Sequence, residues 1–284
     1  MISKRKIIVS VVVIIIATGT LLYSNRVKVK DIFLNLKSNS VPEAVTYGQA
    51  KKRMMLVDGS VETIEIIPLE ADLTLPEKNS KALDSPSPQK EEELAIPEEF
   101  NLDVPFTPQA PNAVWDEIHQ DACEEASALM AAFFVLERPI LGPSDTDKEL
   151  LKIVDWQKRY FGFWKDTDAS QTADILREYY GLKNIEVQYD ITIEDIKREI
   201  AQGHPVIIPA AGRELGNQYY TPPGPYYHML VVKGYTKNRI ITNDPGTKRG
   251  ENFSYKNDIF YNAIHDWNSG DIAGGKKAMI VVKK

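Results

Sequence analysis

The fold is decided by the stretch from Asp121 to Leu136, which reads DACEEASALMAAFFVL. Asp121 can cap a helix that begins after it, and Glu124, three residues later, completes a capping box. The apolar side chains then recur at helical spacing, at Ala126, Leu129, Met130, Phe133 and Leu136. The stretch is therefore predicted to form a helix with one buried face.

Further helices are predicted first along the chain, and strands afterwards. The helices are expected around 150–160, 172–180 and 192–202, and glycines end the last two. Short β-branched runs bounded by Gly, Pro or Asn predict strands at 205–209, 228–234, 239–243 and 278–282. This order indicates an α+β domain, in which N-terminal helices pack on an antiparallel sheet.

Composition limits the class of protein. The chain has 284 residues, a net charge of −6 and a single cysteine. Lys4, Arg5 and Lys6 give the first 25 residues +3, and subtracting +3 from −6 leaves −9 for the rest. So acidic a body is a poor partner for phosphate backbones, and no nucleic-acid partner is expected. One cysteine excludes an intramolecular disulfide and any multi-cysteine zinc or iron–sulfur site, and no metal or cofactor is predicted.

An apolar run follows the basic N-terminus, from Ile7 to Tyr23. As a helix it would extend roughly 25 Å, slightly less than a hydrocarbon core but within the tolerated range. A buried element of a soluble core is the alternative, but the basic flank and the absence of charge within the run favour a membrane segment. We expect residues 1–25 to be an uncleaved signal-anchor, with the basic end in the cytoplasm and the long C-terminal body outside, as a single-pass protein of the cell membrane. Cleavage of the segment stays open.

Residues 26–95 do not have the composition of a buried hydrophobic core. Between residues 75 and 93 the chain reads LPEKNSKALDSPSPQKEEE, which is rich in Pro, Ser and charge and is typical of a flexible linker. Residues 54–73 contain enough apolar side chains for a local pair of strands. All four tryptophans lie beyond residue 96, where a packed domain is predicted over 96–284.

Cys123 is the first candidate for chemistry. It lies in the first turn of the predicted helix, where unpaired backbone N–H groups favour a thiolate. A small buried core residue is the structural alternative. Glu124 and Glu125 would oppose ionisation if they faced the sulfur, so a nearby cation is needed.

His228 is the best source of that cation. It opens the apolar strand predicted at 228–234, and Asp244 follows the next strand, predicted at 239–243. Two adjacent antiparallel strands joined near Lys237-Asn238 can bring the carboxylate beside the imidazole, where it would orient the ring and favour its protonated form. The alternative for His228 alone is a buried, hydrogen-bonded histidine, and the alternative for Asp244 alone is a turn residue.

The other histidines have simpler explanations. His119 is close to Cys123 in sequence and can compete as a base, but its neighbours look exposed. His204 lies in a helix-to-strand turn, and His265 is expected on a surface helix. No HExxH, Walker or dinucleotide-binding pattern is present. The segment Tyr219–Tyr227 predicts a rigid loop beside His228, which can wall a substrate cleft.

Five motifs together resemble the bacteriocin-processing peptidase family, which removes double-glycine leaders. They are Val104–Gln109 (VPFTPQ), Trp115, Cys123–Met130 (CEEASALM), Tyr227-His228 and Asn243–Gly246 (NDPG). The resemblance covers roughly residues 100 to 270 and is closest to stand-alone members that lack a transporter. It implies a papain-like cysteine peptidase fold.

The same resemblance implies roles for individual residues. Cys123 would be the nucleophile, His228 the general base and acid, Asp244 the orienting carboxylate and Gln109 the oxyanion donor. The chain departs from the family in two respects. Glu-Glu follows the cysteine where Gly-Pro is common, and Gln109 precedes the cysteine by fourteen residues, which leaves Gln120 as the fallback donor.

These observations predict a membrane-anchored, extracytoplasmic cysteine peptidase that acts on a peptide or protein substrate. Two alternatives keep the same scaffold. One is an amidase or acyl transferase that acts on cell-wall peptides or amine acceptors, because the acyl-enzyme is common to all of these reactions. The other is a non-catalytic binding module, for which Glu124 and Glu125 would be signs of decay. The oligomeric state is not predicted.

Overall fold

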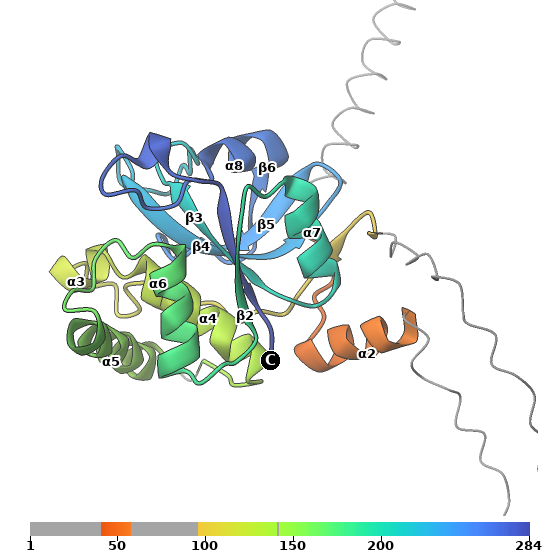
Figure 1. Cartoon of the computed structure of the whole chain (residues 1–284), viewed down its shortest axis with the longest axis horizontal. Helices are drawn as coiled ribbons and strands as arrows, with labels where there is room; N and C mark the ends of the chain where they lie inside the picture. The colour runs from red at the N-terminus through yellow and green to blue at the C-terminus, as the bar shows by residue number, and fades with distance from the viewer. Residues whose placement is uncertain (1–40, 58–95, 141) are drawn as a thin grey trace, which may run out of the picture.

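A computed structural model describes residues 41–57, 96–140 and 142–284 (Figure 1). The predicted membrane segment at 7–23 and most of the predicted linker lie outside these residues. Within the described ranges, no helix combines the length and apolar character that crossing a membrane requires.

The described elements alternate between helices and strands more often than the sequence predicts. In chain order they are α2 (Tyr47–Val57), β1 (Phe100–Asn101), α3 (Glu117–Gln120), α4 (Cys123–Val135), α5 (Pro143–Tyr160), α6 (Ala169–Asp174), η1 (Ile175–Tyr179), β2 (Ile185–Tyr189), α7 (Ile193–Ala201), β3 (Val206–Ala211), β4 (Tyr227–Tyr235), β5 (Arg239–Asn243), β6 (Phe253–Lys256), α8 (Asn257–Ala263), η2 (Ile272–Gly274) and β7 (Ala278–Val282).

The strands form one antiparallel sheet in the order β2-β7-β3-β4-β5-β6, and β1 pairs with the end of β4. All four predicted strands are present as β3, β4, β5 and β7, so the α+β class with an antiparallel sheet is confirmed. In β4, His228 lies opposite Ala210 of β3, and Val231 lies opposite Asn243 of β5. This register brings the start of β4 and the end of β5 to the same end of the sheet.

Helices cover both faces of the central strand. Successive side chains of a strand point to opposite faces, and all nine residues of β4 are buried. Both α4 and α7 pack against β4, and Figure 1 shows α7 on the other side of the sheet from α4, α5 and α6. The core therefore extends on both sides of β4, whose first residues are buried within it.

The central helix α4 begins differently from the prediction. Its N-cap is Ala122, which makes no side-chain cap, so the predicted capping box of Asp121 and Glu124 is wrong. Asp121 instead ends α3, where its N–H donates to Ile118, and its carboxylate lies 2.9 Å from the ammonium of Lys165. Helix α4 is also buried on nearly every side, because the sheet and the helices α5 and α6 enclose it.

The other three predicted helices are present with shifted ends. Helix α5 starts seven residues earlier than expected, since Pro143 occupies its first turn and needs no N–H partner. Asp168 caps α6 and Thr192 caps α7, each within a complete capping box. The predicted helix at 172–180 is divided between α6 and the π-helical turn η1.

Residues 41–57 do not behave as part of a linker. Val45 forms a parallel bridge with Leu102, and Ala50 of α2 is only 3% exposed. Tyr47 packs edge-to-face on Phe134 of α4. The pair of strands proposed for 54–73 is wrong where it overlaps this region, because residues 54–57 are the last turn of α2. The predicted linker is thus interrupted by a segment that packs on the domain.

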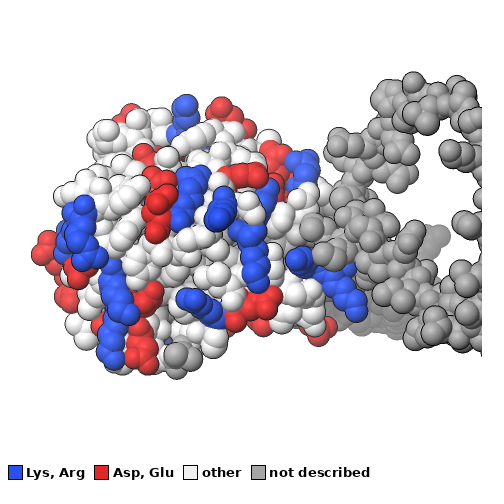
Figure 2. All heavy atoms as spheres, turned by 60° about the horizontal axis from the view of Figure 1, so that its bottom comes forward, with Lys and Arg blue, Asp and Glu red and all other residues white. Residues whose placement is uncertain are grey.

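Charged side chains of both signs are interspersed on the face in Figure 2. The two signs mix on this face rather than separate into large fields. Ion pairs also form along helix α5, where Lys148 lies 3.0 Å from Asp145 and Lys152 lies 3.3 Å from Glu149.

Candidate active site

Cys123 lies where α4 meets the sheet. It is the first residue of α4, its side chain is 5% exposed, and a backbone hydrogen bond from Met229 of β4 reaches the sulfur. It lines a cavity of about 890 Å³ together with His228 and Gln109. The structure therefore brings these three predicted residues to one cavity.

His228 and Asp244 contact each other through the register of β4 and β5. Nε2 of His228 lies 2.8 Å from Oδ1 of Asp244, and both side chains are almost completely buried. A neutral ring that donates from Nε2 to a carboxylate has its lone pair at Nδ1. The prediction that adjacent strands bring these residues together is confirmed by this contact.

The Asp244 carboxylate is unusually well supplied with donors. They are the ring of His228, the backbone N–H of Gly246, the side-chain amide of Asn217 and the hydroxyls of Tyr220 and Tyr255. Burial alone would raise the pKa of Asp244, but the His228 charge and these hydrogen bonds lower it to about 2. Asp244 is therefore a carboxylate at any physiological pH.

Two glycines allow the loops to approach this pair closely. A Cβ at Gly246 would lie 3.0 Å from Cε1 of His228 and 2.9 Å from Cε1 of Tyr220. A Cβ at Gly212 would lie 3.1 Å from Cβ of His228 and closer still to Pro225. The backbone around the imidazole is thus packed too tightly for larger residues.

Two buried acids follow the cysteine. Oε2 of Glu124 lies 3.1 Å from the Cys123 sulfur, and Gln157 of α5 donates to Oε1 of Glu125. Burial, followed by the charge of Glu125, raises the pKa of Glu124 well above its usual value, and burial raises that of Glu125 to about 8. Burial and the charge of Glu124 also raise the pKa of the Cys123 thiol. The sequence predicts that an acid facing the sulfur would oppose ionisation of the thiol, and Glu124 is the acid that contacts it.

Gln109 ties together three segments around the cavity. Its Nε2 donates to the carbonyls of His119 at 2.9 Å and Gln120 at 3.0 Å, and its backbone N–H donates to Pro245 at 2.9 Å. Both amide hydrogens are therefore engaged, and donation to an oxyanion requires one of them to be exchanged. Gln120 also lines the cavity, and its own amide donates to Trp115. The role of either as an oxyanion donor stays a prediction.

The other three histidines make contacts of their own. His119 is buried, contrary to the expectation from its neighbours, and its ring nitrogens lie 2.7 Å from Asp116 and 2.9 Å from Asp147. It is not among the residues lining the cavity. His204 contacts Glu199 at 2.9 Å. His265 was expected on a surface helix but lies just beyond α8, where its ring contacts the carbonyl of Gly275.

The predicted loop at Tyr219–Tyr227 lines the cavity, and aromatic residues of other segments extend this lining. Tyr219, Tyr220, Tyr226 and Tyr227 all line the cavity, and Trp115 and Trp267 join them from two other segments. Sequence reasoning did not identify Asn217, Tyr255 or Trp267 as part of the site. Only their proximity in the folded chain connects them to Asp244 or to the cavity.

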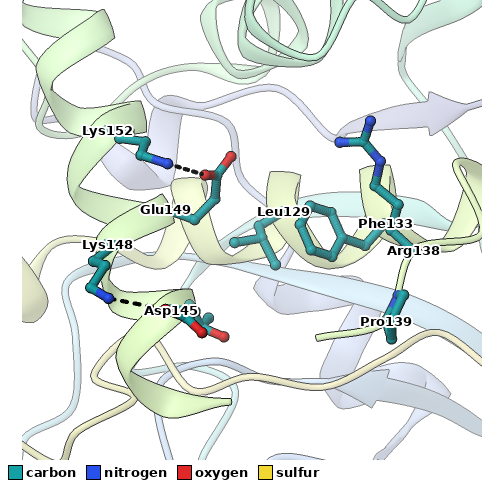
Figure 3. Close-up of a pocket in the computed structure, with 9 residues that line it drawn as sticks. Leu129, Phe133, Arg138, Pro139, Asp145, Lys148, Glu149 and Lys152 are labelled. Atoms are coloured by element: carbon teal, nitrogen blue, oxygen red, sulfur yellow. Dashed lines mark hydrogen bonds and ion pairs between the residues drawn. The ribbon is translucent and has the colours of Figure 1, made fainter. Parts of the chain in front are cut away.

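A second, smaller pocket of about 340 Å³ lies between α4 and α5. Figure 3 shows Leu129 and Phe133 of α4 at its base and the ion pairs of Lys148 and Lys152 along α5. Neither cysteine nor histidine lines it. The cavity at Cys123 is therefore the better candidate for chemistry.

Comparison with known proteins assigns the chain to a family. A model of the peptidase C39-like family matches residues 101–270, so the chain belongs to that family. A search of curated proteins found no match. Among solved structures, a protein from Bacillus anthracis that is provisionally described as a C39-like peptidase is 17% identical. The alignment covers 66% of this chain and 99% of that one, with a TM-score of 0.45.

Proposed function

We propose that the protein is a cysteine peptidase, in which Cys123, His228 and Asp244 hydrolyse a peptide bond. The observation that carries the proposal is the cavity at the start of α4. There the sole thiol of the chain lines the same space as an imidazole held at 2.8 Å by a buried carboxylate. Membership of the peptidase C39-like family supports the same class of reaction.

The proposed reaction follows from the contact between Nε2 of His228 and the Asp244 carboxylate. His228 donates from Nε2 to Asp244, so Nδ1 accepts the proton of the Cys123 thiol. The sulfur attacks the carbonyl carbon of the scissile bond. The backbone N–H of Cys123 supports the resulting oxyanion, because first-turn amides of a helix have no partner within it. Gln109 is the proposed second donor, by exchange of one of its carbonyl contacts.

The second half of the reaction returns the enzyme to its starting state. The tetrahedral intermediate collapses and breaks the C–N bond, and the departing amine takes the proton from His228. His228 then removes a proton from water, which attacks the thioester and releases the acid. The thiol regains its proton, so protons and bonds balance over the cycle.

The decisive experiment compares the wild type with Cys123→Ala on a diverse peptide library, with products identified by mass spectrometry. We expect new amino termini only with the wild type. Cleavage by the Cys123→Ala protein at the same rate would overturn the proposal. Parallel assays with cell-wall peptides and added amines test the amidase and acyl-transfer alternatives, since these give different products from the same acyl-enzyme.

We further propose that residues 7–23 anchor the protein in the cell membrane, with the domain outside the cytoplasm. The apolar run and its basic flank support this. Protease added to intact cells should digest the domain, whereas the same protease should leave a cytoplasmic marker untouched. Recovery of the full chain in the soluble fraction would contradict anchoring.

A further inference from the structure

Glu124 occupies a position that the peptidase mechanism does not use. Its Oε2 lies 3.1 Å from the Cys123 sulfur, its side chain is 1% exposed, and it lines the catalytic cavity. It is therefore the acid nearest to the atom on which the thiolate forms. A carboxylate at that distance would repel a thiolate, whereas a carboxylic acid would donate a hydrogen bond to it.

Burial and the acids that face Glu124 favour its carboxylic acid form. On its own helix Glu125 does so, and the loop before α6 contributes Asp166, whereas the hydrogen bond from the Cys123 thiol acts in the other direction. From β4 come Tyr227 and, across the cavity, His228. In the described part of the chain, neither Glu124 nor Glu125 is paired with Lys or Arg. Burial and these acidic neighbours raise the pKa of Glu124 well above its usual value.

Apart from the backbone N–H of Met229, which reaches the sulfur, the nearby hydrogen-bond donors are engaged elsewhere. Gln109 gives both amide hydrogens to the carbonyls of His119 and Gln120. The hydroxyl of Tyr227, which is close enough to feel the charge of Glu124, donates to the carbonyl of Thr167. A protonated Glu124 would thus be the side chain that donates to the sulfur.

We propose that Glu124 is a catalytic residue that acts as a neutral carboxylic acid and donates its O–H to the Cys123 thiolate. When His228 takes the thiol proton, the site holds one thiolate, one imidazolium, the Asp244 carboxylate and one neutral acid. Glu124 keeps its proton throughout, and no bond to it is made or broken. Loss of that proton would place a second negative charge 3.1 Å from the sulfur. The repulsion would disfavour the thiolate and so lower the reactivity of Cys123.

This inference rests on the proposed function for its catalytic meaning, but its test does not. Cys123 is the sole cysteine, so the rate of alkylation by iodoacetamide reports its thiolate alone. We expect the rate to rise with pH as the thiolate forms and then to fall as Glu124 ionises. The full-length wild type is compared with Glu124→Gln, Glu124→Ala and Glu125→Gln.

The three variants have different expected outcomes. Glu124→Gln keeps a neutral donor and should move the alkaline fall upwards by roughly one pH unit or more, or abolish it. Glu124→Ala has no donor and should react about tenfold more slowly near neutral pH. Glu125→Gln is the matched control. Because the charge of Glu125 raises the pKa of Glu124, its removal should move the fall to lower pH, opposite to Glu124→Gln.

Two results would overturn the proposal. One is a folded Glu124→Gln protein that loses reactivity as fully as Glu124→Ala, because the carboxylate would then act as a proton acceptor. The other is an unchanged pH profile in all three variants. If the wild type cleaves no peptide yet alkylation shows the expected profiles, the peptidase proposal fails and the role of Glu124 stands. Thermal unfolding of each variant verifies that it is folded.

Discussion

The hydroxyl of Tyr255 lies 2.5 Å from Oδ2 of Asp244, while the other oxygen of the same carboxylate lies 2.8 Å from His228. Tyr255 is in β6 and Asp244 directly follows β5, so the pairing of these two strands supports the carboxylate from the side away from the imidazole. Asp244 is thus fixed by contacts to two neighbouring strands.

Removal of this hydroxyl should weaken both stability and acid resistance. The pKa of Asp244 is depressed to about 2, so its contribution to stability is present above the usual aspartate pKa and is lost as pH falls through about 2. We expect Tyr255→Phe to lower the free energy of unfolding by about 1–2 kcal/mol at pH 7. The difference should narrow as pH falls towards about 2, where Asp244 of the folded protein is itself protonated. Urea unfolding at several pH values measures this difference in unfolding free energy.

Tyr219→Phe is the control, since Tyr219 lines the cavity but does not donate to Asp244. Equal losses in the two variants would contradict the prediction.

Gly246→Ala should impair catalysis more than folding. The added Cβ would lie 3.0 Å from Cε1 of His228 and 2.9 Å from that of Tyr220, so the imidazole must move. Displacements of this kind commonly cost about a hundredfold in rate. Peptide hydrolysis measures kcat/KM, and circular dichroism verifies the fold. Gly48→Ala is the control, because no atom lies within 4 Å of its added Cβ. Full activity in Gly246→Ala would show that the ring tolerates the displacement.

Helix α2 should contribute to stability without contributing to the reaction. Ala50 is 3% exposed and packs at Gly203, whereas none of the residues 41–57 lines the cavity at Cys123. Ala50→Asp would bury an unpaired carboxylate and should cost about 2–4 kcal/mol of unfolding free energy. Activity well below the melting temperature should be unchanged. Lys52→Asp, at an exposed position of the same helix, is the matched control. An equally stable Ala50→Asp protein would mean that α2 does not pack on the domain in solution.

Lys233→Met should stabilise the protein at neutral pH. Lys233 is in β4, is 2% exposed and has Asn252 as its hydrogen-bond acceptor. Burial lowers its pKa to about 8. Below that pH the folded protein must hold a buried charge. The stability of the wild type therefore rises as pH increases from about 8 towards the usual pKa of lysine. The variant should gain about 1–3 kcal/mol at pH 7, and the gain should shrink towards pH 10. A gain that does not change with pH would indicate better packing rather than the loss of a charge.

The sequence predicts the site best where it depends on one pair of strands. His228 and Asp244 are separated by a single hairpin, so period-two alternation and one turn are enough to bring them together. Asn217 and Tyr255 reach the same carboxylate from other segments. Their approach depends on how the sheet and its loops pack, which no local pattern encodes.

Helix starts were harder to predict than helices themselves. Asp121 satisfies the rules for an N-cap, yet the short helix α3 ends on it and Lys165 takes its carboxylate. Glu124 was expected to turn back towards the helix N-terminus but lies against the sulfur. Tertiary contacts outweighed the local capping preference in both residues. Helix α2 was missed because it lies between segments whose composition is typical of a linker, and the burial of Ala50 against the domain is visible only in the folded chain.

The layered construction of the cavity has a mechanical consequence. The imidazole and its carboxylate belong to the sheet, whereas the thiol belongs to α4, which packs on that sheet. A force or a bound molecule that slid α4 along β4 would alter the sulfur–imidazole separation and leave the imidazole–carboxylate contact intact. The thiol and the imidazole–carboxylate pair thus belong to two different layers of the fold. The rate of thiolate formation would therefore report a displacement of α4 relative to the sheet.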